Sequence, residues 1–169
     1  GSTCLVLSDK NISNQKASIP SILTVGAVHS HLVKHGLRGY CSLNVECSDA
    51  MDTHSFAILI GVGATTVNPY LAIDSIYQRF EKKLFGKSDF EACVNRFKKS
   101  IDAGLLKIMS KMGISVISSY RGGCNFEAVG LSRAIVSDYF PGMSSRISGI
   151  GIIGIEKKIK ELHEKFNAK

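Results

Sequence analysis

Five polar side chains stand where four short apolar segments of the sequence end, and their types are suited to binding a ligand. Each segment is short and rich in aliphatic residues, which is typical of a buried strand in a parallel sheet. The carboxyl ends of parallel strands meet at one edge of a sheet, where such folds bind their ligands. We therefore expect any small-molecule site to lie among the residues at these ends, which are Asp9, Glu46, Asn68, Tyr120 and Arg121.

Arg121 has the most specific chemistry of the five, because Gly122 and Gly123 follow it. A guanidinium binds phosphate or carboxylate through paired hydrogen bonds, and glycine lets main-chain N–H groups approach an anion. The pattern is consistent with a small anionic ligand. An ion pair from Arg121 to Asp9 or Glu46, which would only fix the rim of the sheet, explains the same residues, and we favour this structural role.

Motifs for metal, dinucleotide or nucleophilic chemistry are missing from the sequence. His31 and His35 are four apart, as zinc ligands on a helix can be, but no H-E-x-x-H motif and no C-x-x-C pair occurs. Gly61-Val62-Gly63 follows a predicted helix and precedes a predicted strand, the reverse of a dinucleotide-binding loop. No G-x-S-x-G motif is present. We therefore expect no metal site and no catalytic residue in this chain.

The elements that must position the strand-end residues alternate between strand and helix. Short apolar runs predict strands at 4–7, 40–46, 64–67 and 114–117. Apolar residues three and four apart predict helices at 18–35, 52–60, 69–80, 89–110 and 133–140, one from about Asn125, and a C-terminal helix at 154–169. Residues 145–155 form either a last strand or a closing loop. Helix-capping side chains are available at Ser18, at Asp52 or Thr53, at Ser88 or Asp89, and at Ser132.

This alternation predicts an α/β fold with a parallel sheet and right-handed crossovers. Four or five β/α units are too few for a complete eight-stranded barrel. We therefore predict a partial or degenerate β/α-barrel-like parallel sheet with surrounding helices, with an open doubly wound sheet as the alternative. The 169 residues suffice for one α/β domain, 1–169, with a core of its own.

Composition narrows the class of protein further. The net charge is +7, but the basic residues are spread along 79–107 and 157–169 and mixed with acidic ones, which argues against a nucleic-acid partner. No stretch approaches the ~20 consecutive apolar residues of a membrane span, and the start does not read as a secretory signal. Five irregularly spaced cysteines fit a reducing compartment, so we expect a cytoplasmic protein, or a plastid one in a plastid-bearing source.

Three stretches carry a resemblance to a known family. They contain VLSD with IPSILTVGAVH, then HSFAILIGVGATTVNPYLAI, and then KIMSKMGIS with SYRG and FEAVGLS, in residues 4–35, 54–73 and 104–131. In this order they resemble the central region of the large subunit of glutamate synthase, just before the FMN-binding domain. The sequence departs from the family pattern at Gly123, Cys124 and Asn125, where an Ala-Gln-type pair is expected.

The resemblance implies a function for the parent enzyme and a role for this segment. The parent would convert glutamine, 2-oxoglutarate and reductant to two glutamates, using FMN and an iron–sulfur cluster that this segment does not bind. The segment would connect the glutamine amidotransferase and FMN domains and support the ammonia tunnel between them; a small subunit or a reductant protein is a further possible partner. The alternative is a free-standing α/β module that binds a small anion or a flavin phosphate.

Overall fold

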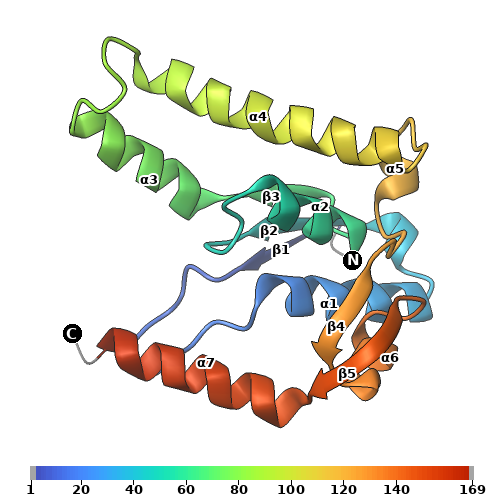
Figure 1. Cartoon of the computed structure of the whole chain (residues 1–169). Helices are drawn as coiled ribbons and strands as arrows, with labels where there is room; N and C mark the ends of the chain where they lie inside the picture. Colours follow the sequence, from blue (N-terminus) through green and yellow to red (C-terminus); the bar gives the residue numbers. More distant parts are fainter. Residues whose placement is uncertain (1–2, 168–169) are drawn as a thin grey trace.

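The chain forms two small parallel sheets packed with seven α-helices in a computed structural model, which describes residues 3–167 (Figure 1). The strands are β1 (Cys4–Ser8), β2 (Ser42–Glu46), β3 (Thr66–Asn68), β4 (Glu127–Leu131) and β5 (Ser144–Ile150). The helices are α1 (Ser21–Lys34), α2 (Thr53–Gly61), α3 (Tyr70–Glu81), α4 (Phe90–Lys111), α5 (Ile117–Tyr120), α6 (Arg133–Tyr139) and α7 (Ile152–Asn167), with a 3-10 turn, η1 (Arg38–Tyr40). The predicted α/β class with a partial parallel sheet is confirmed, and these strands close no barrel.

The first sheet has the order β1-β2-β3, with all strands parallel. Leu43 and Val45 of the central strand β2 are 0% and 3% exposed, because α1 and α2 pack against the sheet. Leu7 pairs in register with Val45, and Val45 with Val67, so aliphatic residues face each other across the sheet. The helices α1 and α2 are the crossovers that parallel neighbours require.

The second sheet contains β4 and β5, which are parallel and connected through α6. This unit is attached to the first sheet where α6 packs on α1. Ser30 in α1 donates a hydrogen bond from Oγ to the main-chain oxygen of Tyr139, 3.0 Å away. One continuous core then runs from Val25 and Val45 to Val136 and Phe140, so the two sheets share one apolar interior.

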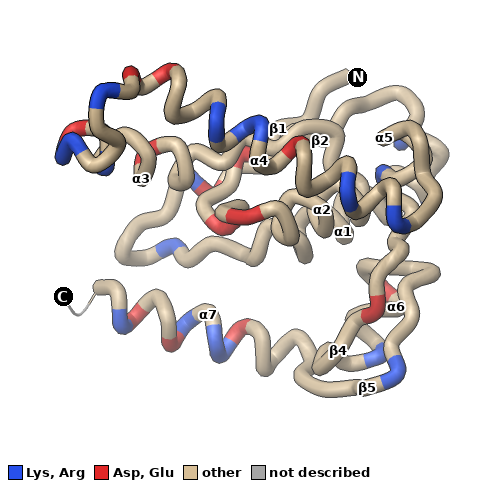
Figure 2. Tube along the Cα trace, turned by 45° about the horizontal axis from the view of Figure 1, so that its top comes forward, with Lys and Arg blue, Asp and Glu red and all other residues tan. Residues whose placement is uncertain are grey.

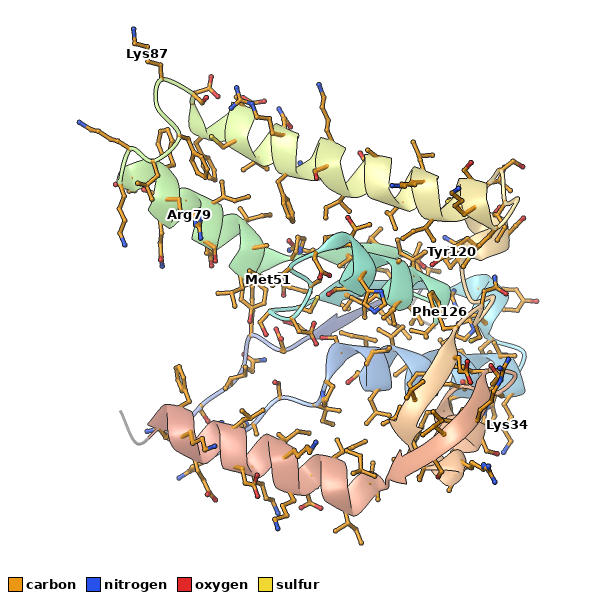
Figure 3. The ribbon with its side chains drawn as sticks, in the orientation of Figure 1. Lys34, Met51, Arg79, Lys87, Tyr120 and Phe126 are labelled. Carbon is orange, nitrogen blue, oxygen red and sulfur yellow. The ribbon has the colours of Figure 1, made fainter. Side chains whose placement is uncertain are left out.

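A long helical hairpin of α3 and α4 extends from the first sheet (Figure 1). Tyr77, Phe80 and Phe90 pack together at its outer end, with ring centroids 5.5 and 5.9 Å apart. Lys87 projects from the connection at the tip (Figure 3). Basic and acidic residues alternate along this hairpin and along α7 (Figure 2), which is the pattern of a solvated face.

The structure corrects two predicted elements between residues 114 and 131. Residues 114–117 form no strand: Val116 and Ile117 are half exposed, and Ile117 begins the short helix α5. The helix predicted from about Asn125 is instead strand β4, in which Ala128 is buried and Val129 exposed. The apolar runs were too short to distinguish helix from strand by periodicity, and pairing with β5 decided the outcome.

The predicted C-terminal helix is present as α7, which begins two residues earlier than expected. The last two residues of the predicted range, 168 and 169, lie outside the described residues. The segment expected as a last strand or a closing loop forms β5, and Gly151 separates this strand from α7.

Candidate functional site

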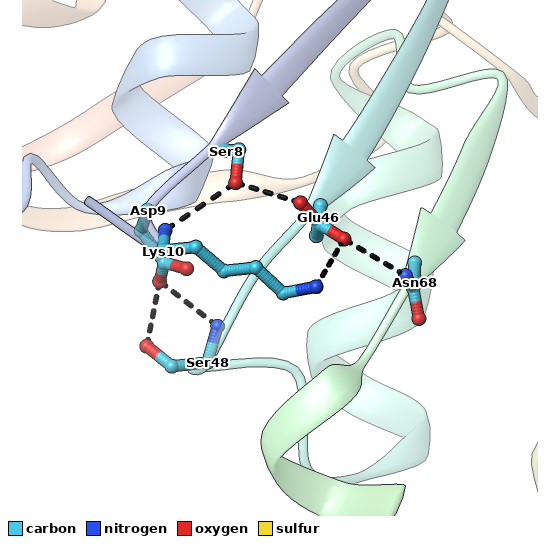
Figure 4. A network of polar contacts seen from close by, with 6 residues as sticks. All are labelled: Ser8, Asp9, Lys10, Glu46, Ser48 and Asn68. Atoms are coloured by element: carbon cyan, nitrogen blue, oxygen red, sulfur yellow. Dashed lines mark hydrogen bonds and ion pairs between the residues drawn. The ribbon is translucent and has the colours of Figure 1, made fainter.

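Three of the five strand-end residues lie together at the carboxyl edge of the first sheet (Figure 4). Glu46 ends β2 and pairs in register with Asn68, the last residue of β3. Asp9 immediately follows β1, and its N–H donates to the main-chain oxygen of Glu46 at 3.3 Å. The register of the parallel strands therefore brings residues 9, 46 and 68 to one edge, as expected for this topology.

Glu46 is the centre of the network at this edge. Its Oε1 accepts hydrogen bonds from Lys10 Nζ at 2.6 Å and from Asn68 Nδ2 at 3.2 Å, and its Oε2 accepts one from Ser8 Oγ at 2.8 Å. The bond from Lys10, followed by that from Ser8, lowers the pKa of Glu46. Glu46 therefore remains a carboxylate at neutral pH and is a poor proton donor.

Asp9 anchors the start of the next loop. Its Oδ2 accepts from the N–H of Ser48 at 2.9 Å and from Ser48 Oγ at 2.6 Å. Its Oδ1 is buried and has no hydrogen-bond partner within residues 3–167. Burial, followed by the Asp9 carboxylate, raises the pKa of Tyr70, and Lys10 Nζ lies 5.0 Å from the centre of the Tyr70 ring. The Lys10 cation is thus held between Glu46 and an aromatic face.

A cavity of about 290 Å³ lies beside this edge. It is lined by the end of β1, the loop before α1, the start of α1 and the end of β2. Two carboxylates, Asp9 and Glu46, and one cation, Lys16, line the cavity, whereas Lys10 does not. The cavity therefore offers groups of both charges to a small polar molecule.

Tyr120 and Arg121 lie at the opposite end of the first sheet, because the strand expected before them does not form. Gly122 N–H donates to the main-chain oxygen of Ile60 at 3.2 Å, which places this loop at the end of α2 that leads into β3 (Figure 1). Tyr120 is 1% exposed and donates from its hydroxyl to the oxygen of Ala57 at 3.1 Å. It packs edge-on against Phe126 (Figure 3). Tyr120 is thus a core residue.

The expected ion pair from Arg121 to Asp9 or Glu46 is wrong. Glu46 pairs with Lys10 instead, and Arg121 lies near Arg38, where its charge, after burial, lowers the pKa of Arg38. The five strand-end residues therefore divide into an edge network of three and a separate pair at the other end of the sheet.

Arg38 forms a junction that the sequence reasoning missed. Its Nε donates to Nδ1 of His29 at 3.1 Å, and its terminal nitrogens donate to the oxygens of Cys41 and Gly63 at 2.5 and 2.8 Å and to Thr65 Oγ1 at 3.3 Å. Burial and then the Arg38 charge lower the pKa of His29, so a neutral ring accepts the bond from Arg38. The one signal in the sequence was a histidine within the apolar pattern of α1.

The His31–His35 pair is a local contact at the end of α1, where His35 directly follows the last helical residue. The two rings lie 4.2 Å apart, and Nδ1 of His35 is 2.8 Å from the main-chain oxygen of His31. Within residues 3–167, no three or more His, Cys, Asp or Glu residues are grouped as a metal site requires.

Comparison with known families identifies the chain. Residues 1–132 match the family described as the glutamate synthase central domain. The chain belongs to the glutamate synthase central domain family. The resemblance seen in the sequence is therefore confirmed, and this central domain includes all of the first sheet, the α3–α4 hairpin and β4.

Relatives of the central domain are much longer enzymes. The 169-residue chain is 58% identical over 96% of its length to the glutamate synthase [NADPH] large chain of Azospirillum brasilense, and 42% identical over 96% to that of Bacillus subtilis. It is 42% identical over 89% to the ferredoxin-dependent, chloroplastic glutamate synthase of Spinacia oleracea. The chain spans 10 to 11% of the length of these relatives. None of the helices described for this central domain is both long and apolar enough to cross a membrane.

Proposed function

We propose that this chain is the part of a glutamate synthase that connects the glutamine amidotransferase and FMN domains and supports the ammonia tunnel between them. The parent enzyme would form two glutamates from glutamine, 2-oxoglutarate and a reductant. The match of nearly the whole chain to about a tenth of each relative supports a segment of a longer enzyme, and the description of the matched family as a central domain supports a place between other domains. We place the parent in the cytoplasm, or in a plastid where the source has one, as the name of the spinach relative suggests.

The residues of this segment do not fit the cofactors of the parent enzyme. An iron–sulfur cluster needs grouped cysteine thiolates, whereas no three potential metal ligands come together in residues 3–167, and Cys47 and Cys93 are buried singly. An FMN phosphate needs grouped cations or main-chain donors, but Lys10 is paired with Glu46, Lys16 lines a cavity that also holds the carboxylates of Asp9 and Glu46, and Arg121 lies at the other end of the sheet. FMN and iron–sulfur chemistry would therefore belong to other domains of the parent.

The observation that carries the proposal is the exposed apolar surface of the second sheet. Val129 in β4 and Ile147 in β5 pair in register and are 64% and 61% exposed. Parallel sheets are normally covered on both faces, and contiguous exposed apolar surface marks an interface. A neighbouring domain of the parent chain would cover this face, and the same reasoning extends to the small subunit or a reductant protein as further partners.

The test uses the full-length parent enzyme carrying Ile147→Asp, with Ser148→Asp as the matched control. Ile147→Asp replaces an apolar side chain that pairs in register with Val129, whereas Ser148→Asp adds the same charge at the neighbouring polar position and leaves this apolar pair intact. We expect Ile147→Asp to raise the ammonia released to solvent per glutamate formed, because the domains on either side of the tunnel no longer align. An unchanged ratio with full turnover in Ile147→Asp would show that this face does not support the tunnel.

A further inference from the structure

The helix α7 lies apart from the rest of the molecule along most of its length (Figure 1). None of its residues is buried. Beyond its packing on β5, its far end is held by His163 Nε2 and Asn167 Nδ2, which lie 3.2 and 3.5 Å from the main-chain oxygen of Asn14. A helix of 16 residues has little stability alone in water, so its apolar side requires cover.

An open apolar groove runs between α7 and the body of the molecule. Two adjoining cavities of about 470 and 600 Å³ form it, and both are lined by Ile159. The body contributes the loop before α1 and the first turns of α1, including Leu23 and Val28. At the far end, Leu162 and Phe166 line the groove and are 68% and 77% exposed.

The spacing of the apolar residues of α7 indicates what fills the groove. They recur in steps of three and four, which is the heptad spacing of a helix that packs along another helix; they are Ile152, Ile155, Ile159, Leu162 and Phe166. The seam covers about 21 Å at the rise of an α-helix. An amphipathic helix laid in the groove would match both its length and its apolar lining.

The charges beside this seam indicate which charge the partner helix carries. Lys158 and Lys165 each precede a seam residue, so they flank one side of it, and neither forms an ion pair within residues 3–167, whereas Glu156 is paired with Lys160. A second copy of α7 would place these lysines opposite its own lysines or His163, in either orientation. A helix with acidic residues on the matching flank satisfies them instead.

We propose that the groove between α7 and α1 receives an amphipathic helix of the parent chain, outside these 169 residues, whose apolar face covers the heptad seam and whose acidic flank faces Lys158 and Lys165. The proposal rests on the proposed function in one respect, namely that the chain is part of a longer polypeptide. About nine-tenths of each relative lies outside the matched stretch and can supply such a helix.

The first experiment measures access to the seam in the full-length enzyme. Leu162→Cys is compared with Lys157→Cys, which lies on the outer face of the same helix, and maleimide labelling is followed by peptide mass spectrometry. We expect Leu162→Cys to label at least ~10-fold more slowly, as for a site that reacts only when the groove opens. Equal rates would overturn the proposal. Protection that disappears on dilution would also overturn it, because a second copy would then be the cover.

The second experiment identifies the covering segment. The photo-reactive amino acid benzoylphenylalanine replaces Leu162 during synthesis of the full-length enzyme, so the groove is closed around it before photolysis, and the cross-linked peptide is sequenced. We expect a parent-chain peptide with apolar residues at helical spacing and acidic residues beside them. A cross-link only to α1, or to the same region of a second copy, would refute the inference. Hydrogen exchange of α7 in the unmodified enzyme is the variant-free check, and fast exchange there would also refute it.

These measurements do not depend on turnover. If the seam is protected but Ile147→Asp does not change the ammonia released per glutamate, the docked helix is supported and the tunnel role is rejected. If the seam is accessible but Ile147→Asp raises the ammonia released per glutamate, the tunnel role is supported and the docked helix is rejected.

Discussion

Replacing Gly26 with alanine tests whether the close contact between α1 and α6 holds the two sheets together. Gly26 is buried in α1, and a Cβ atom at this position would lie 2.7 Å from Cδ1 of Phe140 and 2.8 Å from the main-chain oxygen of Tyr139. Phe140 is 3% exposed, and the Tyr139 oxygen already accepts the hydrogen bond from Ser30. Neither neighbour can withdraw without disturbing the core.

Close packing and helix propensity predict changes of opposite sign in the free energy of unfolding of Gly26→Ala. Alanine in a helix is more favourable than glycine by about 1 kcal/mol, so propensity alone predicts stabilisation. Forcing an extra carbon into a filled core costs about 1–3 kcal/mol, and the upper part of this range applies because one contact is main chain. We therefore expect Gly26→Ala to lower the free energy of unfolding by about 1–2 kcal/mol.

The assay is urea unfolding of the 169-residue chain followed by circular dichroism. Gly39→Ala is the matched control, because a Cβ there would have no atom within 4 Å, and it should change the free energy by less than about 0.5 kcal/mol. Ser30→Ala removes the neighbouring hydrogen bond to Tyr139 and should cost about 0.5–1.5 kcal/mol. A rise in the urea midpoint of Gly26→Ala would refute the close packing of α1 on α6.

Three further predictions concern single side chains. Because the pKa of His29 is lowered in the folded chain, the unfolded chain takes up a proton first as pH falls below about 6.5. The free energy of unfolding should therefore fall across that range. His29→Gln leaves Arg38 without a titrating partner and should flatten this pH dependence, measured by urea unfolding. Tyr120→Phe removes the hydrogen bond from the buried hydroxyl to the Ala57 oxygen and should cost about 0.5–1.5 kcal/mol in the same assay; a neutral effect would contradict the buried bond. Burial and then the nearby Asp49 carboxylate raise the pKa of Cys47 to about 12, so a maleimide at pH 8 should modify the exposed Cys4 and spare Cys47; modification of both at equal rates would contradict the fold.

The first sheet could be predicted because its signals are local. Each strand is a short aliphatic run followed by a polar residue, and each crossover helix has apolar residues at helical spacing. Three of the predicted helix caps are confirmed: Asp52, Asp89 and Ser132 accept hydrogen bonds from the main-chain N–H three residues later, at 2.8, 2.6 and 3.3 Å. The cap predicted at Ser18 is wrong, because α1 begins after Pro20 and has no side-chain cap. A cap needs only its own turn, so the sequence suffices to identify it.

The region from 114 to 131 could not be predicted because distant residues decide its structure. The strand β4 forms through pairing with β5, and the two strands are separated by α6 in the sequence. A four-residue apolar run fits a strand or a helical turn equally well. Tyr120 and Arg121 were therefore expected at a strand end that does not exist. Asp9, Glu46 and Asn68 do lie at one edge, because the register of the first sheet brings them there.

The distribution of buried and exposed apolar residues argues that the interior of this segment is complete and its surface is not. Val25, Leu43 and Val62 are at most 1% exposed, so the core between the sheets is filled as in a finished domain. Exposed apolar residues occur along the whole chain, but on the last elements they line up: Val129 of β4 pairs in register with Ile147 of β5, and Leu162 and Phe166 lie along the groove side of α7. Single exposed apolar residues are ordinary on a protein surface, whereas apolar residues aligned on adjacent elements form the kind of surface that neighbouring parts of a larger enzyme would cover.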